Sequence, residues 1–210
     1  MPVTMLRLLF LAPLLWLGGC ATLSDTARPP APADAVTQAV QAGDCRTAYG
    51  LLEAAPAAAP EQRLRVGQVC LQSGDFSRAR RVTANFDADF PEHPDGDYVV
   101  YLHVLAGFGQ WSRSSAGPAE DRVREGRALF QEMVTYLRER PLAEYTDNLA
   151  TRLVRLREDI AGAEVALAER EERRGNQAEA RARAEYVLEY YPRTQAAADA
   201  ARLLMTIDGG

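Results

Sequence analysis

Residues Gly74 to Pro91, with the sequence GDFSRARRVTANFDADFP, decide the fold of this chain. A Gly-Asp pair opens the stretch, a small residue follows at Ala79, and a proline closes it. The same spacing recurs twice, at Gly43, Ala48 and Pro60 and at Gly175, Ala180 and Pro192. A spacing that recurs in this way is typical of a chain built from one repeated structural unit.

Each position of the repeat has a physical role in a pair of helices. Glycine ends the first helix because it adopts a left-handed conformation cheaply, and the Asp or Asn that follows caps the second helix. Alanine suits a close helix crossing, and proline stops the second helix because it lacks an amide hydrogen. The intervening apolar residues recur at three- and four-residue spacing, which favours helices over strands. The unit resembles the tetratricopeptide repeat of about 34 residues.

A third unit with a longer connection is expected between the second and the last. Gly109 fits the repeat period as its turn glycine, but the next proline is Pro141, so about 15 residues are inserted in that unit. We expect the insertion to form a loop at Trp111 to Ala119, WSRSSAGPA. Loops of this length often carry a function, and a loop without one is nearly as plausible.

The sequence therefore predicts an all-α tetratricopeptide-repeat solenoid over residues 34–206, with about four helix pairs and a C-terminal capping helix. The expected pairs cover 34–60, 61–91, 97–141 and 142–192, with the capping helix at 194–206. Asp34 is expected to cap the first helix. The predicted apolar stripe of the capping helix consists of Ala197, Ala201, Leu204 and Met205.

The N-terminal segment has the layout of a secretory signal over residues 1–19, with one positive charge at Arg7 and an apolar run after it. The run ends in Leu17-Gly18-Gly19-Cys20, which resembles the lipobox of bacterial lipoproteins. The resemblance implies that Cys20 is acylated and becomes the first residue; an ordinary signal with a chance cysteine is the alternative. Residues 20–33 are rich in Pro, Ala and Thr and are expected to form a flexible tether.

Composition excludes several function classes. The chain carries 29 acidic and 24 basic residues, a net charge of −5, and no basic run for a phosphate backbone, so nucleic acid is not an expected partner. Every basic residue is arginine, which removes lysine-dependent catalysis. No metal or cofactor is expected. A lipid-anchored helical muramidase is the enzyme alternative, but the Glu-Ser pair typical of such enzymes does not occur in the sequence.

One segment points to a particular family. Residues Phe90 to Tyr101, FPEHPDGDYVVY, resemble a P-x-H-P-x-x-D-Y-V-x-Y stretch of the BamD family, the tetratricopeptide lipoproteins of the outer-membrane β-barrel assembly machinery. Residues 145–164 and Tyr190 to Ala196 resemble that family's last repeats. The segment AAPAAAPEQ at 54–62 and the pair Arg170-Glu171 depart from its pattern, so we expect a divergent or shortened member.

The resemblance implies a non-catalytic scaffold, anchored by lipid at the periplasmic face of the outer membrane. Its implied partners are the POTRA domain of the barrel-assembly subunit and other lipoproteins of that complex, and its implied role is outer membrane protein insertion. A cell-envelope coordinator of the Tol-Pal or peptidoglycan type uses the same repeats and remains the alternative.

Three residues of the last repeat are candidate partner contacts. Arg183, Tyr186 and Tyr190 share one flank of a predicted helix whose core stripe is Ala180, Ala184, Val187 and Tyr191. Arg and Tyr are common at protein interfaces, and the resemblance places this region against the POTRA domain. The alternative is that the tyrosines pack beneath the C-terminal helix and Arg183 is simply solvated.

Two further groups are expected to be structural. His93, Pro94, Asp97 and Tyr98 belong to the turn that enters the third repeat, where His93 orders the turn rather than acting as a pH-responsive ligand. His103 is expected to be packed in the following helix. Cys45 and Cys70 lie at helix ends that antiparallel packing brings to one height, so a disulfide is predicted, with two buried thiols as the alternative.

Overall fold

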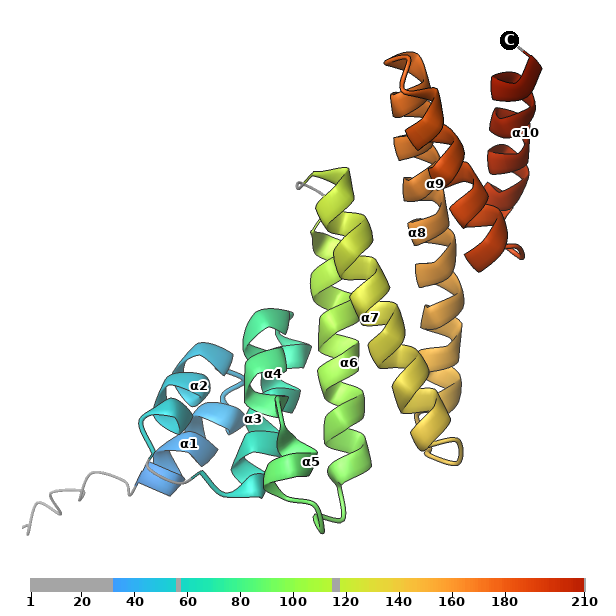
Figure 1. The fold of residues 1–210 in the computed structure, drawn as a ribbon. Coiled ribbons are helices and arrows are strands. Elements are labelled where there is room, and N and C mark those ends of the chain that lie inside the picture. The colour runs from blue at the N-terminus through green and yellow to red at the C-terminus, as the bar shows by residue number, and fades with distance from the viewer. Residues whose placement is uncertain (1–31, 56–57, 115–117, 210) are drawn as a thin grey trace, which may run out of the picture.

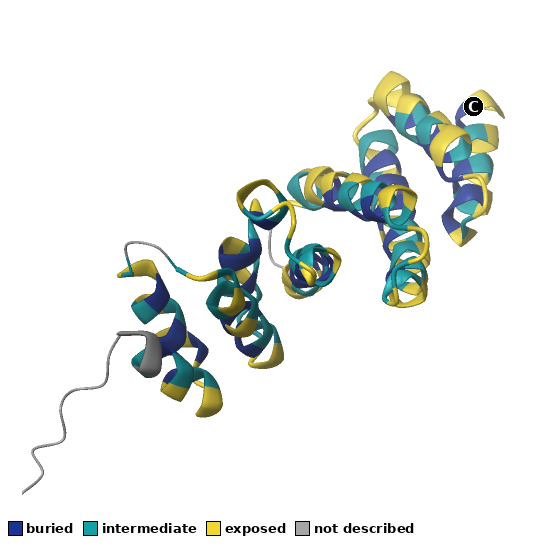
Figure 2. Ribbon diagram, turned by 90° about the horizontal axis from the view of Figure 1, so that it is seen from below, coloured by how far each residue is buried: buried dark blue, intermediate teal, exposed yellow. Residues whose placement is uncertain are grey.

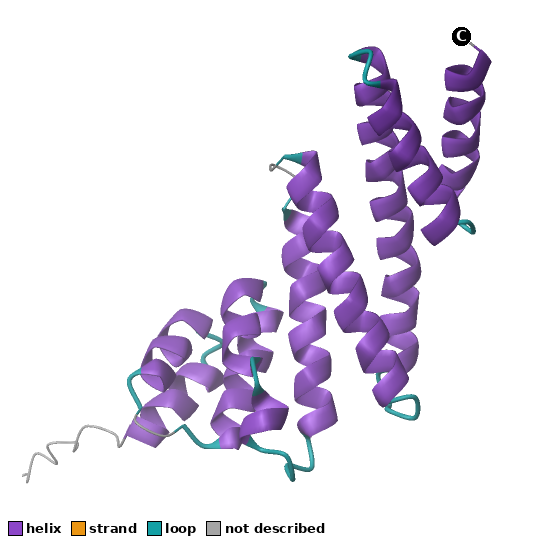
Figure 3. Cartoon of the chain, in the orientation of Figure 1, coloured by secondary structure: helices purple, strands orange, loops and turns teal. Residues whose placement is uncertain are grey.

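The computed structural model describes residues 32–55, 58–114 and 118–209. Over these ranges the chain forms helices and no strand (Figure 3), which confirms the predicted all-α class. The helices are α1 (Pro32–Gln41), α2 (Cys45–Glu53), α3 (Pro60–Gln72), α4 (Phe76–Thr83), α5 (Phe86–Asp89), α6 (Gly96–Arg113), α7 (Ala119–Glu139), α8 (Thr146–Arg173), α9 (Gln177–Tyr190) and α10 (Gln195–Gly209).

The helices stack as antiparallel pairs into a rising solenoid (Figure 1). The pairs are α1 with α2, α3 with α4, α6 with α7 and α8 with α9, and α5 is a single turn between the second and third pairs. The second helix of one pair packs on the first helix of the next, as α4 does on α6 and α7 on α8. Helix α10 packs against α8 and α9 and closes the stack, as predicted.

The predicted turn glycines hold in three of four positions. Gly43, Gly74 and Gly175 have φ angles of 70°, 76° and 83°, which a side chain would strain. Asp44 and Asp75 cap the following helices, because their carboxylates accept the backbone N–H groups of residues three positions later at 3.0 and 3.2 Å. Asn176 instead donates its side-chain amide to Glu171 at 2.7 Å, so the predicted side-chain cap is wrong there.

The prediction for Gly109 is wrong, because this glycine lies inside α6. A Cβ atom built on Gly109 would come within 2.6 Å of the ring of Phe76 in α4. The glycine therefore allows the two helices to approach closely instead of ending one of them. A turn glycine and a close-contact glycine look alike in a sequence, and only their neighbours distinguish them.

The expected long loop at Trp111 to Ala119 is also wrong. Helix α6 continues to Arg113 and α7 begins at Ala119, so the inserted residues lengthen both helices. Trp111 is 5% exposed and its indole N–H donates to the carbonyl of Arg122 at 3.2 Å. Residues 115–117 of the predicted loop lie outside the described residues. The insertion therefore gives the third repeat more core.

The N-terminal boundaries differ slightly from the prediction. The predicted signal at 1–19, Cys20 and the tether up to residue 31 lie outside the described residues, whereas 32–33 already belong to α1. Because α1 begins at Pro32, Asp34 is not its N-cap. Proline is favoured in the first helical turn, where its missing N–H would have no partner.

The prolines and the last helix bring two more corrections. Pro60 does not end the first pair, because α2 ends at Glu53 and Pro60 is the first residue of α3. In α10 the buried side chains are Ala196, Ala197, Ala200 and Ile207. Met205, predicted to face the core, is 66% exposed. The helix is therefore turned slightly from the expected face, toward α8 as well as α9.

The core lies between the helices along the whole stack, as the burial colours in Figure 2 show. One cluster joins the first two pairs around Val66, Cys70 and Val82, and a second extends from α6 to α10 around Met133 and Leu156. Leu71 packs against both clusters, so the interior is continuous. The core positions predicted in α9, Ala180, Ala184, Val187 and Tyr191, are all buried.

A disulfide joins Cys45 to Cys70, with an S–S distance of 2.04 Å. Cys45 is the first residue of α2 and Cys70 lies in the last turn of α3, so the bond links the first helix pair to the second. Both residues are buried. The sequence predicted this pairing, because antiparallel packing places the two helix ends side by side.

Candidate protein-docking surface

Helix α9 presents the predicted ridge of Arg183, Tyr186 and Tyr190, which we call the docking ridge. Tyr190 is 55% exposed and Tyr186 is partly buried, and their ring centroids lie 4.5 Å apart. Tyr186 also packs edge-on against buried Tyr191 at 5.9 Å. Burial raises the pKa of Tyr191 to about 12. The ridge thus combines one exposed ring with one ring that is partly buried against the core.

Arg183 is engaged within the protein and not simply solvated. Its Nη1 donates to Glu164 Oε2 at 3.0 Å, and its Nε lies 2.9 Å from Glu179 Oε1. Glu164 comes from α8 and is only 1% exposed. A buried carboxylate needs compensating partners, because removing it from water is costly. Arg183 supplies one of them while keeping its side chain 26% exposed.

The second partner of Glu164 is Arg127 from α7, which pairs with the other carboxylate oxygen. The guanidinium carbon of Arg127 also lies 4.0 Å from the centre of the Tyr186 ring, in a cation–π contact. A cavity of about 280 Å³ opens at this point and is lined by Glu120, Val123, Arg124, Arg127, Glu164 and Arg183. The three helices α7, α8 and α9 therefore meet at one buried charge beneath the docking ridge.

Sequence reasoning missed both Glu164 and Arg127. A signal was available for Glu164, because it falls on the apolar stripe of α8 between Ile160, Ala161, Val165 and Ala168, all of which are buried. A glutamate on a core stripe indicates a buried ion pair. Arg127 gave no such signal, because it resembles the other solvated arginines of α7.

The predicted turn residues before and within α6 hold three helix pairs together. His93 Nδ1 accepts the backbone N–H of Asp95 at 3.1 Å, and its ring packs edge-on against Phe86 at 5.3 Å. Tyr98 accepts a hydrogen bond from Gln68 of α3 at 3.1 Å and packs against Tyr145 at 4.9 Å. These contacts all lie within the fold, as expected of a structural turn.

The sequence predicted that Asp97 belongs to the turn with His93, and this is wrong, because Asp97 lies in the first turn of α6. It accepts a hydrogen bond from Arg140 Nε at 2.7 Å, at the end of α7. Arg140 also pairs with Asp87 in α5. One arginine thus joins α5, α6 and α7, and the sequence gave no indication of it. Pro94 is exposed and follows His93 in the same turn.

His103 is packed in α6, as predicted. Its Nδ1 lies 3.1 Å from the carbonyl of Arg80 and 3.1 Å from the hydroxyl of Thr83. Because a carbonyl only accepts, Nδ1 carries the hydrogen when it bonds to Arg80. Burial, and secondly the charge of Arg80, lower the pKa of His103, so the ring is kept neutral.

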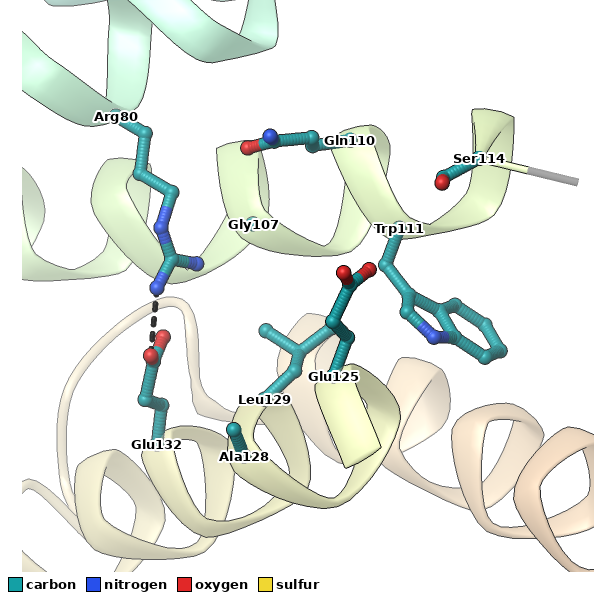
Figure 4. A pocket seen from close by; sticks show the side chains of 9 residues that line it. All are labelled: Arg80, Gly107, Gln110, Trp111, Ser114, Glu125, Ala128, Leu129 and Glu132. Atoms are coloured by element: carbon teal, nitrogen blue, oxygen red, sulfur yellow. Dashed lines mark hydrogen bonds and ion pairs between the residues drawn. The ribbon is translucent and has the colours of Figure 1, made fainter. Parts of the chain in front are cut away.

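A second cavity, of about 340 Å³, lies between α4, α6 and α7 (Figure 4). Arg80 reaches from α4 past Gly107 of α6 to pair with Glu132 of α7 at 2.5 Å. Figure 4 shows Glu125 beside Trp111 on the other side of the cavity. The ion pair joins two successive repeats. The residues that line the cavity do not include a nucleophile paired with a base.

A third hollow, of about 370 Å³, is formed by α3, α6 and α8, the first helices of successive pairs, together with the start of α4. Its apolar part consists of Leu71, Phe76, Leu105 and Phe108, and its edge carries Arg113, Arg152 and Arg155. Arg113 lies 4.4 Å over the ring of Phe76 and donates to the carbonyl of Gly74 at 2.8 Å. An apolar floor with a cationic edge suits an apolar, acidic segment of another chain.

The described residues also bear on metal binding and on membrane insertion. In the described part of the chain no group of three or more His, Cys, Asp and Glu side chains is placed to hold a metal ion. Among the same residues, no helix has the length and apolar character needed to cross a membrane.

Comparison with protein families gives a match that covers nearly the whole solenoid. The family model of the YfiO outer membrane lipoproteins matches residues 33–208, from the second residue of α1 to the last residue but one of α10. The matched range includes the docking ridge, the buried Glu164 and the turn around His93. The chain therefore belongs to the YfiO family of outer membrane lipoproteins.

Proposed function

We propose that this protein is a BamD-like, non-catalytic scaffold of the outer-membrane β-barrel assembly machinery. The docking ridge binds the POTRA domain of the barrel-assembly subunit, and the assembled complex, with its other lipoproteins, inserts outer membrane proteins. The observation that carries the proposal is the docking ridge, with an exposed Tyr190 near Arg183, on the last repeat of an outer membrane lipoprotein solenoid. Exposed Tyr beside Arg is typical of interfaces.

Anchoring follows from the N-terminal sequence. Residues 1–19 direct export, and Cys20 carries the acyl chains that hold the protein at the periplasmic face of the outer membrane. Two or more acyl chains give stable attachment, because each buried CH₂ contributes about 0.8 kcal/mol. The segment from Cys20 to α1 then sets how freely the solenoid moves beneath the membrane.

The test is co-purification from detergent-solubilised envelopes, followed by mass spectrometry of the bound proteins. Tyr190→Ala is the sharpest variant, because this side chain is largely exposed and its loss leaves the core intact. Arg183→Glu also removes the ridge, but it places a second carboxylate against Glu164 and so disturbs the fold as well.

Leu142→Ala is the matched control, because Leu142 is 97% exposed in the turn between α7 and α8. We expect the barrel-assembly subunit to co-purify with the wild-type protein and with the Leu142→Ala variant. Much less of the subunit should co-purify with the Tyr190→Ala variant. Envelope-division or peptidoglycan-binding proteins in its place would support the Tol-Pal-type coordinator. Equal recovery with both variants would remove the docking ridge from the interface.

A further inference from the structure

We infer that Glu164 is a positioning residue for the docking ridge: its buried carboxylate fixes Arg183 directly and the two tyrosines through Arg127. The inference rests on the proposed function, because it concerns how that surface is prepared for a partner. Glu164 itself is 1% exposed and makes no contact with solvent of any consequence.

The carboxylate of Glu164 binds two arginines, one through each oxygen. Oε1 of Glu164 accepts from Arg127 of α7, and Oε2 accepts from Arg183 of α9 at 3.0 Å. The arginine side chains are 39% and 26% exposed, so each keeps part of its surface at the protein boundary. The charge is therefore buried, while the groups that it orients are not.

Arg127 connects the buried carboxylate of Glu164 to the two tyrosines. Arg127 is held by Glu164 and lies 4.0 Å over Tyr186, and the Tyr186 ring lies 4.5 Å from that of Tyr190. Tyr190 is the most exposed of these side chains. An arginine without an anchor samples many rotamers, and a partner must immobilise it on binding. Glu164 removes that cost before the partner arrives.

The effect of Glu164 on docking can be distinguished from an effect on the stability of the fold. A buried ion pair is weak evidence for stability, because an apolar side chain of similar volume often replaces it without loss. Both arginines here reach solvent, and Arg183 keeps its ion pair with Glu179, so neither charge is stranded when Glu164 is replaced. A Glu164→Met protein should therefore fold and melt much like the wild type. A positioning role predicts that its docking is nevertheless impaired.

The experiment compares Glu164→Met with Glu120→Met in the full-length protein. Glu120 is the matched control, because it lines the same cavity but makes its ion pair with Arg170 instead of Arg127 or Arg183. The first readout needs no partner: ¹⁹F NMR of 3-fluorotyrosine-labelled protein, with the Tyr186 and Tyr190 signals assigned by Tyr→Phe variants. The second is the affinity for the purified POTRA region of the barrel-assembly subunit.

We expect Glu164→Met to shift and narrow the Tyr186 and Tyr190 signals and to weaken POTRA binding about tenfold, as expected when two or three side chains must be immobilised on binding. Its melting temperature should stay near that of the wild type, and Glu120→Met should change neither readout. Unmoved fluorine signals would overturn the inference, whatever the affinity. An unchanged affinity with moved signals would overturn it too. Failure of the wild-type protein to bind the POTRA region would refute the proposed function, while the fluorine signals still decide whether Glu164 positions the ridge.

Discussion

The Phe76 ring lies against the backbone of Gly109, where a Cβ atom would come within 2.6 Å of it. The contact joins α4 of the second pair to α6 of the third, so it sets how closely two successive repeats approach.

Gly109→Ala should therefore destabilise the protein, although alanine is the better helix former. Overpacking costs about 1–3 kcal/mol, which exceeds the gain in helix propensity of about 1 kcal/mol. Gly162→Ala is the control, because Gly162 lies within α8 with nothing within 4 Å of a built Cβ, and it should be stabilising. Urea unfolding measures both. Equal stabilisation by the two substitutions would contradict the close packing.

Loss of the disulfide should loosen the N-terminal end of the stack more than the rest. The bond closes a loop with a sequence separation of 25, which corresponds to a contribution of about 3 kcal/mol. We expect Cys45→Ala with Cys70→Ala to lower stability by that order, and hydrogen exchange to rise in α1 to α3 first. Wild-type protein with reductant should behave alike. Uniform loss of protection along the chain would argue against a local effect.

Stability should depend on His103 in mildly acidic solution. Its pKa is lowered in the folded state, chiefly by burial, so the unfolded chain binds the proton more tightly. The free energy of unfolding should therefore fall as the pH drops from the ordinary histidine value of 6.5 toward the folded pKa. His103→Gln should remove this part of the pH dependence. Thermal melts of both proteins between pH 7.5 and pH 5 provide the measurement; parallel curves would contradict it.

Two alanine substitutions test which face of α10 packs against the solenoid. Ile207 is 8% exposed, so Ile207→Ala should cost about 2 kcal/mol or more, through lost burial and a small cavity. Met205 is 66% exposed, so Met205→Ala should change stability by less than about 0.5 kcal/mol. Chemical denaturation distinguishes them. The reverse order would restore the stripe predicted from the sequence.

The features that could be predicted from the sequence are those that depend on nearby residues in the chain. Left-handed glycines and aspartate caps depend on neighbours in the chain, so Gly74 and Asp75 lie where expected. Gly109 and Trp111 were placed wrongly because their roles depend on α4 and α7, which lie far away in sequence. The contacts of Glu164 and Arg140 escaped prediction for the same reason: each joins helices from different repeats.

The two ends of the solenoid are far apart in Figure 1, with α1 at one end of the stack and α9 and α10 at the other. In the proposed function, the tether that starts at Cys20 would reach the solenoid at α1, while a partner on the docking ridge would bind at the opposite end. The stack would then separate the end of the tether from the partner. Deleting or adding one helix pair in the middle would leave both attachments intact but change how far beneath the membrane the partner is held.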